Sequence, residues 1–352
     1  MENVLTKFDN YKRTWSVKAE LPIEFILKYS SDVFDVNNHD LLSFNESNRK
    51  VVVIDATEEN KDWHHTDQIL KFFEDVGVLR REPVIVIGGG VLLDLVGFCC
   101  SIYRRGIPYV KVPTTLLAIV DASVGVKVAA NHFNRRNRIG AYYPPIATLL
   151  DKKFIKTQDQ RNIVNGIAEI FKLAVIKDKE LFELMEESYE QLVDEKFQFG
   201  AVPVRVINLA ITGMIEELAP NLWERKLDRC VDFGHSFSPI IEMQNISNLQ
   251  HGEAVVLDCL FSSCLSQVRG YIDMPTLQRI FQTANNLKLP VFHKDFCNFD
   301  LLKKSLSDTM KHRNGNQYLP VPVGIGNYKI LNDVTDDEIR KASDLFEEVE
   351  YE

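Results

Sequence analysis

Three side chains in the second half of the chain are of the types that bind a catalytic metal ion. Glu169 lies in the segment GIAEIFK, His235 in DFGHSFSP and His251 in HGEAV. Two imidazoles and one carboxylate suit zinc and leave coordination positions open for substrate oxygens. The spacings are too long for a local metal motif. A hydrogen-bonded core histidine at 235 and a histidine at a helix N-terminus at 251 therefore remain alternatives.

Lys172 follows Glu169 by three residues, so the two side chains share one face of a predicted helix. A surface ion pair is the simplest interpretation of this spacing. The neighbouring residues are mostly apolar, however, which predicts a buried helix. A carboxylate and an ammonium group inside such a helix need a partner or a function.

A glycine triplet marks a second candidate site. Gly88, Gly89 and Gly90 follow the apolar run Val84–Ile87 and precede an apolar helical pattern. Glycines let the backbone approach a pyrophosphate closely, and the N-terminus of the next helix offers free N–H groups. The pattern is typical of a dinucleotide site, although a tight strand–helix turn without a ligand has the same glycines.

The segment after this helix places polar side chains among small and apolar ones, as in the lining of a cleft. Thr114 and Thr115 can hydrogen-bond a cofactor, and Asp121 can hold a hydroxyl group. Lys127 can bind a phosphate as a point charge. A solvated loop is the alternative. The polar line continues at Asn131, Arg136 and Asn137.

The fold that must position these residues is predicted by apolar patterns. Runs at Val51–Ile54, Val84–Ile87 and Tyr109–Val112 indicate buried parallel strands, with a helix over Gln68–Val78. This alternation predicts a doubly wound α/β domain, residues 1–156. Residues 157–352 are predicted to form a mainly helical domain. Its patterns are Ile163–Ile176, Leu181–Leu192, Val202–Leu218, Val255–Val268 and Pro275–Asn286, with strand signals in Leu319–Ile330.

Composition excludes several classes of protein. A formal net charge of -9 over 352 residues argues against general binding to nucleic acid or anionic membranes. The apolar stretch Val84–Tyr103 contains the glycine triplet and Asp94, so we expect no membrane span there. The six cysteines form no CxxC pair, and the N-terminus has no apolar signal region. We therefore expect free thiols in a cytoplasmic protein.

Together the motifs resemble the dehydroquinate-synthase superfamily of sugar phosphate cyclases, over about Val51–Val334. The matching segments are GGGVLLDLVGF, RRGIPYVKVPTTLLAIVDASVGVK, NRIGAYYPP, GIAEIFKLAVIKD, DFGHSFSPIIE and HGEAV. The resemblance implies an N-terminal Rossmann-like NAD-binding α/β domain and a mainly α-helical C-terminal domain. It also implies a homodimer, a small sugar phosphate as substrate, and NAD and Zn2+ as cofactors, with Co2+ as an alternative metal.

The resemblance implies roles for individual residues as well. Glu169, His235 and His251 correspond to the zinc ligands. The positions corresponding to nucleotide contacts are Asp55, Glu59, Lys61, Gly88, Gly89, Gly90, Asp94, Thr114, Thr115 and Thr157. The positions corresponding to catalytic or substrate contacts are Asp121, Lys127, Asn137, Lys172, Asp232 and His312, with Arg105 reaching the phosphate across the dimer.

The branch of the family is indicated by substitutions within the motifs. Dehydroquinate synthases carry a lysine and an arginine where this chain has Met214 and Asp228, and a second histidine where it has Pro239. Methionine and aspartate cannot pair with a substrate carboxylate, so we expect a substrate without one.

Three segments resemble the branch that cyclises sedoheptulose 7-phosphate: GHSFSP, PNLWERKLDRCVDFGH and KHRNGNQYLPVP. Within this branch, Leu218, Asp232 and His312 resemble the residues of 2-epi-5-epi-valiolone synthases. The expected reaction is that of a carbon–oxygen lyase acting on phosphates. Sedoheptulose 7-phosphate is converted to 2-epi-5-epi-valiolone by transient NAD oxidation, phosphate elimination, re-reduction and intramolecular aldol cyclisation. The alternatives are a synthase of a valiolone epimer, of desmethyl-4-deoxygadusol or of 3-dehydroquinate, a metal-dependent polyol dehydrogenase, and a non-catalytic paralogue.

One segment departs from the family pattern. In the family, the strand corresponding to the run that ends near Asp55 is followed by a helix and another strand before an acidic-Asn-Lys segment. Here Glu58–Lys61 follow almost at once. A block of the nucleotide-binding domain is therefore predicted to be missing after Asp55.

Overall fold

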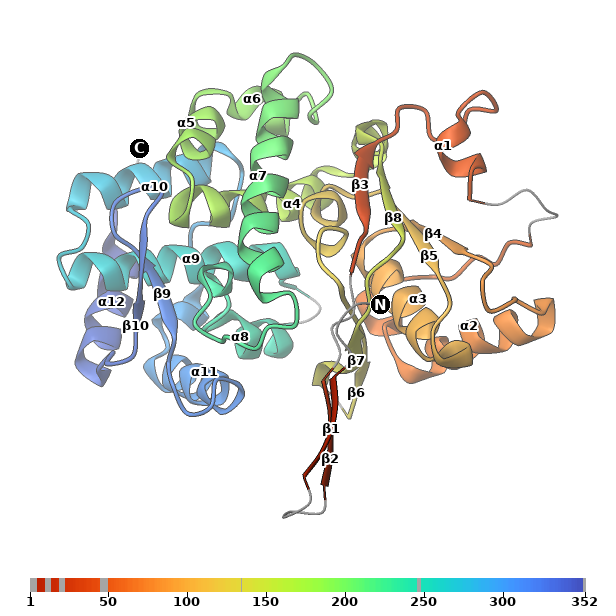
Figure 1. Ribbon diagram of the computed structural model, residues 1–352. Helices are drawn as coiled ribbons and strands as arrows, with labels where there is room; N and C mark the ends of the chain where they lie inside the picture. The colour runs from red at the N-terminus through yellow and green to blue at the C-terminus, as the bar shows by residue number, and fades with distance from the viewer. Residues whose placement is uncertain are drawn as a thin grey trace.

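The computed structural model describes residues 5–9, 14–18, 23–44, 50–133, 135–245 and 248–350. Figure 1 shows an α/β part built on a parallel sheet beside a larger part made mainly of helices. This arrangement confirms the predicted fold class. The order of the two parts along the chain is also as predicted, with the sheet formed before residue 151 and the main helices after residue 159.

The parallel sheet has four strands in the order β3-β8-β5-β4. Their bounds are β3 Ile26–Tyr29, β4 Val84–Gly88, β5 Tyr109–Pro113 and β8 Ala147–Leu150. The apolar runs predicted β4 and β5 correctly, and every residue of β5 is buried, as continuous apolar strands of parallel sheets usually are. The helices of this part are α1 His39–Leu42, α2 Trp63–Val76 and α3 Gly90–Ile102.

The strand predicted at Val51–Ile54 is wrong. These residues are irregular in the structure, and the side chains of Val51 and Val53 are 82% and 90% exposed. Strand β4 is the edge of the sheet, with no strand of the described residues on its outer side. A β-branched run forms a strand only where a neighbouring strand pairs with its backbone, and here none does.

A β-hairpin that the apolar patterns did not predict lies between the two parts of the molecule (Figure 1). It consists of β6 Lys127–His132 and β7 Arg135–Tyr142, paired antiparallel. The inner face of β6 packs on α3. The hairpin therefore presents Lys127 and Arg136 to the helical part, where they meet Glu224 and Glu242.

The helical part is centred on α9, most of whose residues are buried, as expected of a helix that is apolar on all sides. Its helices are α4 Gln160–Ile176, α5 Lys179–Glu187, α6 Tyr189–Val193, α7 Val202–Leu218, α8 Ser238–Gln244, α9 His251–Val268, α10 Met274–Asn286, α11 Phe299–His312 and α12 Asp336–Glu348. Strands β9 Leu319–Pro322 and β10 Tyr328–Leu331 form a hairpin. The single helix predicted over Leu181–Leu192 is interrupted at Ser188.

Helices α4 and α9 approach each other closely because glycine occupies the crossing point. A Cβ atom at Gly252 would lie 2.4 Å from the carbonyl oxygen of Asn165. The Gly252 N–H instead donates to Asn165 Oδ1 at 2.8 Å. This contact sets the start of α9 against the middle of α4, where two of the predicted metal ligands lie.

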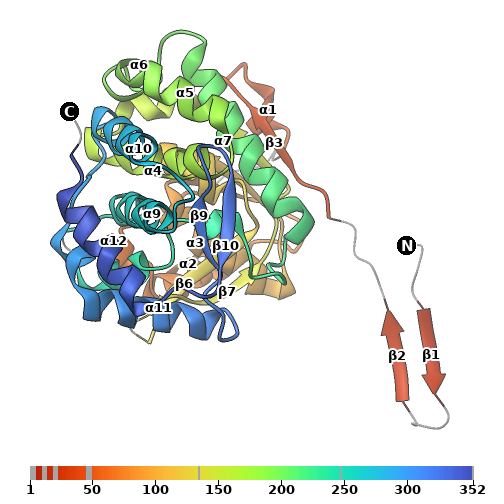
Figure 2. The same ribbon diagram turned by 90° about the vertical axis from the view of Figure 1, so that its left-hand side faces the viewer.

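The N-terminal strands form a separate hairpin. Strands β1 Leu5–Asp9 and β2 Thr14–Lys18 pair antiparallel, and Figure 2 shows them extending away from the rest of the chain. All six cysteines are free thiols. Among the described residues, no helix has the length and apolar character needed to cross a membrane.

Candidate functional site

Glu169, His235 and His251 lie together in the structure. Each offers one ligand atom, and these atoms lie within 4.8 Å of one another. The Nε2 atoms of His251 and His235 are 3.4 Å and 3.9 Å from Glu169 Oε1. This oxygen is buried, and no donor of the described residues meets it with hydrogen-bond geometry, an arrangement that is costly unless a ligand satisfies it. The donor set and the unsatisfied oxygen therefore fit a divalent metal ion such as Zn2+.

The loop that carries His235 is held in place by Asp258 of α9. Asp258 Oδ2 accepts the backbone N–H groups of residues 236–238 at 2.6 to 2.8 Å. Gly234 has a φ of +79°, and a Cβ there would lie 2.7 Å from Cys259 Sγ. A side chain at 234 would thus strain the backbone and collide with α9. The Gly-His sequence is required to bring His235 towards α4.

Lys172 and Glu169 form a buried ion pair, with Nζ 2.5 Å from Oε2. Burial alone would raise the pKa of Glu169, but Lys172 and the two histidines hold it well below the usual range. Burial alone would lower the pKa of Lys172, but Glu169 and Asp121 raise it instead. The pair is therefore charged, which suits a carboxylate ligand and a cation beside the substrate. The pKa of Asp121 is raised by burial and by the charge of Glu169.

The surroundings shift the pKa values of the two histidines in opposite directions. Burial would lower the pKa of His251, but the carboxylates of Glu242 and Glu169 raise it to about 10. Burial and Lys172 lower the pKa of His235 to about 4. For Glu242, burial raises the pKa, but His251 and Arg136 lower it to about 2. Glu242 and Glu169 therefore stabilise positive charge at His251, as a proton or as a bound metal ion would supply it.

A row of alternating charges joins the β6–β7 hairpin to the His235 loop. Lys127 Nζ lies 2.9 Å from Glu224 Oε1, and the Arg229 guanidinium contacts the same oxygen. Arg229 Nη2 donates to Asp232 Oδ1 at 2.8 Å and to Oδ2 at 3.0 Å. Arg313 Nη2 lies 3.4 Å from Asp232 Oδ2. Asp232 is therefore part of an ion network.

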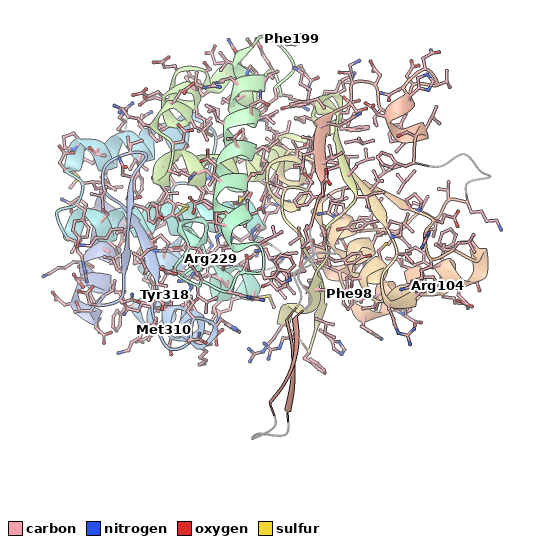
Figure 3. The ribbon with its side chains drawn as sticks, in the orientation of Figure 1. Phe98, Arg104, Phe199, Arg229, Met310 and Tyr318 are labelled. Carbon is pink, nitrogen blue, oxygen red and sulfur yellow. The ribbon has the colours of Figure 1, made fainter. Side chains whose placement is uncertain are left out.

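Glu224, Arg229 and Arg313 were not among the predicted site residues. All three lie in segments that resemble the sedoheptulose 7-phosphate branch, WERKLDR ahead of the His235 motif and KHRNG, but nothing within these segments assigns them a role in the site. Figure 3 shows Arg229 in the helical part, and its contact with Glu224, the partner of Lys127, links it to the hairpin. Lys127 remains 61% exposed, so an anion from solvent can reach it. Partial loss of water around the ammonium group would by itself lower the pKa of Lys127, but Glu224 raises it.

The glycine turn has the local geometry of a phosphate site. Gly89 is the N-cap of α3, and no side chain caps the first turn of the helix. A Cβ at Gly89 would lie 3.2 Å from Thr115 Cγ2, and one at Gly90 would lie 3.3 Å from Ala122 Cβ. The Thr114 N–H donates to the Gly88 carbonyl at 3.0 Å. Uncapped N–H groups on a turn without side chains fit the pyrophosphate of NAD.

Three predicted residues meet beside this turn. Lys61 is buried, and its Nζ lies 2.6 Å from Asp94 Oδ2 on α3 and 2.6 Å from Asn137 Oδ1 on β7. The structure thus brings two predicted nucleotide contacts, Lys61 and Asp94, to a predicted substrate contact, Asn137. The backbone of Asn137 has a φ of +48°, a conformation that asparagine tolerates better than most residues.

Other predicted residues are not brought to these clusters. Within the described part of the chain, no hydrogen bond or ion pair joins any of the following to the remaining predicted site residues: Asp55, Glu59, Arg105, Thr157 and His312. All five are exposed. Thr157 donates to the Phe154 carbonyl beside a surface cavity of about 360 Å³. Arg105 follows the end of α3 opposite the glycine turn, and Figure 3 shows its neighbour Arg104 far from Arg229.

Comparisons with protein families match most of the chain. Residues 51–165 match the model for the 3-dehydroquinate synthase N-terminal region, and residues 166–312 match the model for its C-terminal region. The family boundary at residue 165 lies nine residues after the boundary predicted from the sequence. Both the glycine turn and the Glu169, His235 and His251 cluster lie within the matched ranges.

The chain is also similar to characterised proteins over nearly its full length. It is 39% identical to the 2-epi-5-epi-valiolone synthase of Actinoplanes sp. (97% of this chain, 96% of the relative). It is 41% identical to that of an Actinomyces species (95% and 90%). The first alignment spans 381 positions but holds only 97% of this 352-residue chain. About 40 of its positions therefore have no counterpart here.

A solved structure has the same fold. The 2-epi-5-epi-valiolone synthase of Streptomyces hygroscopicus subsp. jinggangensis 5008, with NAD+ and Zn2+ bound, superposes with a TM-score of 0.90 at 39% identity. The match covers 95% of this chain and 99% of that chain.

Proposed function

We propose that this chain, which belongs to the 3-dehydroquinate synthase family, is a sugar phosphate cyclase. It converts sedoheptulose 7-phosphate to 2-epi-5-epi-valiolone and releases phosphate. One observation carries this proposal. Glu169, His235 and His251 converge beside a buried Lys172, in a chain 39% identical to a 2-epi-5-epi-valiolone synthase over 97% of its length. Both the metal cluster and the lysine are what the reaction requires.

The cofactors follow from the same residues. Glu169, His235 and His251 would hold Zn2+, with Co2+ as an alternative, and the turn Gly88–Gly90 would hold NAD. When bound, the metal polarises a substrate oxygen and the nicotinamide accepts and returns a hydride. In support of this, the solved relative from Streptomyces hygroscopicus subsp. jinggangensis has NAD+ and Zn2+ bound.

The remaining polar residues would bind and orient the substrate. Lys172 is buried and Asp121 is half-buried; both lie close enough to Glu169 to feel its charge, and they would hold substrate hydroxyls. Lys127 and Asn137 lie on the β6–β7 hairpin and would hold the phosphate. Because Lys127 is paired with Glu224, the phosphate must compete with this carboxylate. Such competition favours a doubly charged phosphate over weaker anions.

The positions that distinguish branches support a substrate without a carboxylate. Met214 is buried and offers no charge. Leu218 lies against the turn at Gly125, where a Cβ would be 3.4 Å from its Cδ1. The nearby Arg229 is already held between Glu224 and Asp232. A substrate carboxylate would have to displace one of these partners, and we propose that it is excluded for this reason.

The adenosine side of the nucleotide site is proposed to be reduced. About 40 positions of the Actinoplanes relative have no counterpart here. Among the described residues the sheet ends at β4, and the apolar Val51 and Val53 are exposed instead of paired in a strand. We infer that the missing block follows Asp55 and once covered this edge. NAD+ would then be held mainly through its pyrophosphate and nicotinamide, and we expect it to bind weakly.

We further propose a homodimer in the cytoplasm. The β1–β2 hairpin extends away from its own chain (Figure 2), and a two-stranded hairpin is rarely stable unless it packs against something. Arg105 is exposed and lies at the end of α3 opposite the glycine turn, where it can reach the phosphate only of a partner subunit. The six free cysteines suit a reducing compartment.

One assay tests the activity. Purified protein is incubated with sedoheptulose 7-phosphate, NAD+ and Zn2+, phosphate release is measured, and the product is identified by NMR. We expect stoichiometric phosphate and 2-epi-5-epi-valiolone, with no net NADH. NADH accumulation with simple polyols would instead indicate a dehydrogenase. A folded, metal-loaded protein that releases no phosphate would refute the proposal and favour a non-catalytic paralogue.

A further inference from the structure

The two ring nitrogens of His251 face different carboxylates. Its Nε2 lies 3.4 Å from Glu169 Oε1 inside the metal cluster, and its Nδ1 lies 3.3 Å from Glu242 Oε2 on α8. Glu242 is only 4% exposed. A carboxylate that accepts the Nδ1 proton leaves the Nε2 lone pair directed at a metal, which fixes both the tautomer and the orientation of the ring. Glu242 is thus placed to orient a metal ligand.

The same carboxylate also belongs to a contact between the two parts of the molecule. Arg136, on β7 of the hairpin, contacts Glu242 Oε1 through Nη1. Its Nε lies 3.3 Å from the carboxylate of Glu58, in the short helix Glu58–Asn60. Arg136 therefore bridges a carboxylate of the helical part and one of the nucleotide-binding part. Its side chain is 22% exposed.

The polar contacts continue from Glu58 to the glycine turn. Asn131 Nδ2 donates to Glu58 Oε1 at 2.8 Å, and Asn131 Oδ1 accepts the Asn137 N–H at 2.8 Å. Asn137 in turn accepts from Lys61, which pairs with Asp94 on α3. A continuous row of contacts thus runs from His251 to the second turn of the helix that begins at Gly90.

This row gives the metal and nucleotide sites a shared element. A nucleotide on the glycine turn would restrain α3, Lys61 and the hairpin, and so would hold Arg136 against Glu242. A metal on His251 would restrain the same contact from its other end. Each ligand would then lower the ordering cost of binding the other, and the size of this effect must be the same in both directions.

We propose that Glu242 and Arg136 are positioning residues, and that they make the binding of the metal ion and of NAD+ cooperative. The inference rests on the proposed function, because it takes the triad as the metal site and the glycine turn as the nucleotide site. Glu242 sets the metal affinity through His251. Arg136 connects Glu242 to the residues beside the nucleotide site, so that a bound nucleotide favours the contact between Arg136 and Glu242. Neither residue contacts the reacting atoms.

The test measures binding without substrate. Zn2+ affinity of the metal-free protein is determined by chelator competition, with and without saturating NAD+, and the visible spectrum of bound Co2+ reports the ligand geometry. In the wild-type protein we expect NAD+ to tighten Zn2+ binding by about fivefold or more, the lower end of usual coupling between sites. Glu242→Gln should weaken Zn2+ binding by about 10- to 100-fold and alter the Co2+ spectrum.

The decisive variant is Arg136→Gln. It should bind Zn2+ alone nearly as well as wild type but lose most of the effect of NAD+. A matched control is Arg269→Gln, because Arg269 likewise contacts two carboxylates, of Asp333 and Glu338, away from the site. In this control, the ratio of Zn2+ affinities with and without NAD+ should equal that of the wild type. If Arg136→Gln unfolds, Arg136→Lys is used in its place, and we expect NAD+ to tighten its Zn2+ binding less than in wild type.

Two results would overturn the inference: a wild-type Zn2+ affinity that does not respond to NAD+, or an Arg136→Gln protein with an unchanged ratio. Loss of thermal stability in Arg136→Gln, with the effect of NAD+ on Zn2+ affinity unchanged, would show that Arg136 only joins the two parts. A protein that binds both ligands cooperatively but does not cyclise sedoheptulose 7-phosphate would refute the proposed function and leave this inference standing.

Discussion

Lys111 offers a test of how the site is held together, because its ammonium group is buried and no carboxylate of the described residues forms an ion pair with it. It lies on β5 with its side chain fully buried. Its Nζ donates to the carbonyl oxygens of Ala122 and Gly125 at 3.0 and 3.1 Å. Lys111 thus fastens the turn that follows Asp121. We predict that replacing it with methionine changes the pH dependence of stability.

The magnitude follows from the pKa. Burial lowers the pKa of Lys111 from 10.5 to about 8. Between these two values the unfolded chain binds a proton that the folded chain does not, so this lysine makes stability rise with pH. Each pH unit across this window is worth about 1.4 kcal/mol. Below pH 8 Lys111 is protonated in both the folded and the unfolded chain, and its contribution to the free energy of unfolding no longer changes with pH.

The assay is urea unfolding followed by circular dichroism at pH 7, 8, 9 and 9.5, for wild type and Lys111→Met. Other titrating groups are common to both proteins and cancel in the difference of their unfolding free energies. We expect this difference to be constant up to about pH 8 and then to shift in favour of wild type, by about 2 kcal/mol at pH 9.5. The two unpaired carbonyls in the variant add only a constant offset. A flat difference over the whole range would refute the reasoning.

Three other outcomes are expected. Glu224→Gln removes the carboxylate paired with Lys127, so this lysine should bind inorganic phosphate about two- to fivefold more tightly, the range for a partly exposed ion pair. Calorimetry measures this affinity, and weaker binding would contradict the idea that Glu224 competes with the phosphate. Gly252→Ala places a Cβ 2.4 Å from the Asn165 carbonyl oxygen, so urea unfolding should show that the free energy of unfolding falls by about 1–3 kcal/mol. An unchanged free energy of unfolding would mean that α4 and α9 need not approach closely. Removal of metal with a chelator should abolish phosphate release and added Zn2+ should restore it; activity that survives complete chelation would exclude a metal role for the triad.

Some of this protein could be predicted from local sequence pattern alone. Strands β4 and β5 and helices α4, α7, α9 and α10 follow apolar runs whose period is a property of a few adjacent residues. The residue types of the metal cluster were also visible, because carboxylates and imidazoles inside apolar segments need a function. Local pattern failed at Val51–Ile54, since a strand also needs a neighbour, and the outer edge of β4 provides none among the described residues.

The tertiary structure decided which of the candidate residues meet. Glu169 and His251 come together because glycine at 252 lets α9 touch α4, and His235 joins them because Asp258 holds its loop. The pairing of Lys127 with Glu224, and of Glu242 with both His251 and Arg136, had no counterpart in any short segment. Sequence spacing reports neighbours along one helix or strand. Contacts between residues a hundred positions apart depend on how whole elements pack, and that is settled only by the complete fold.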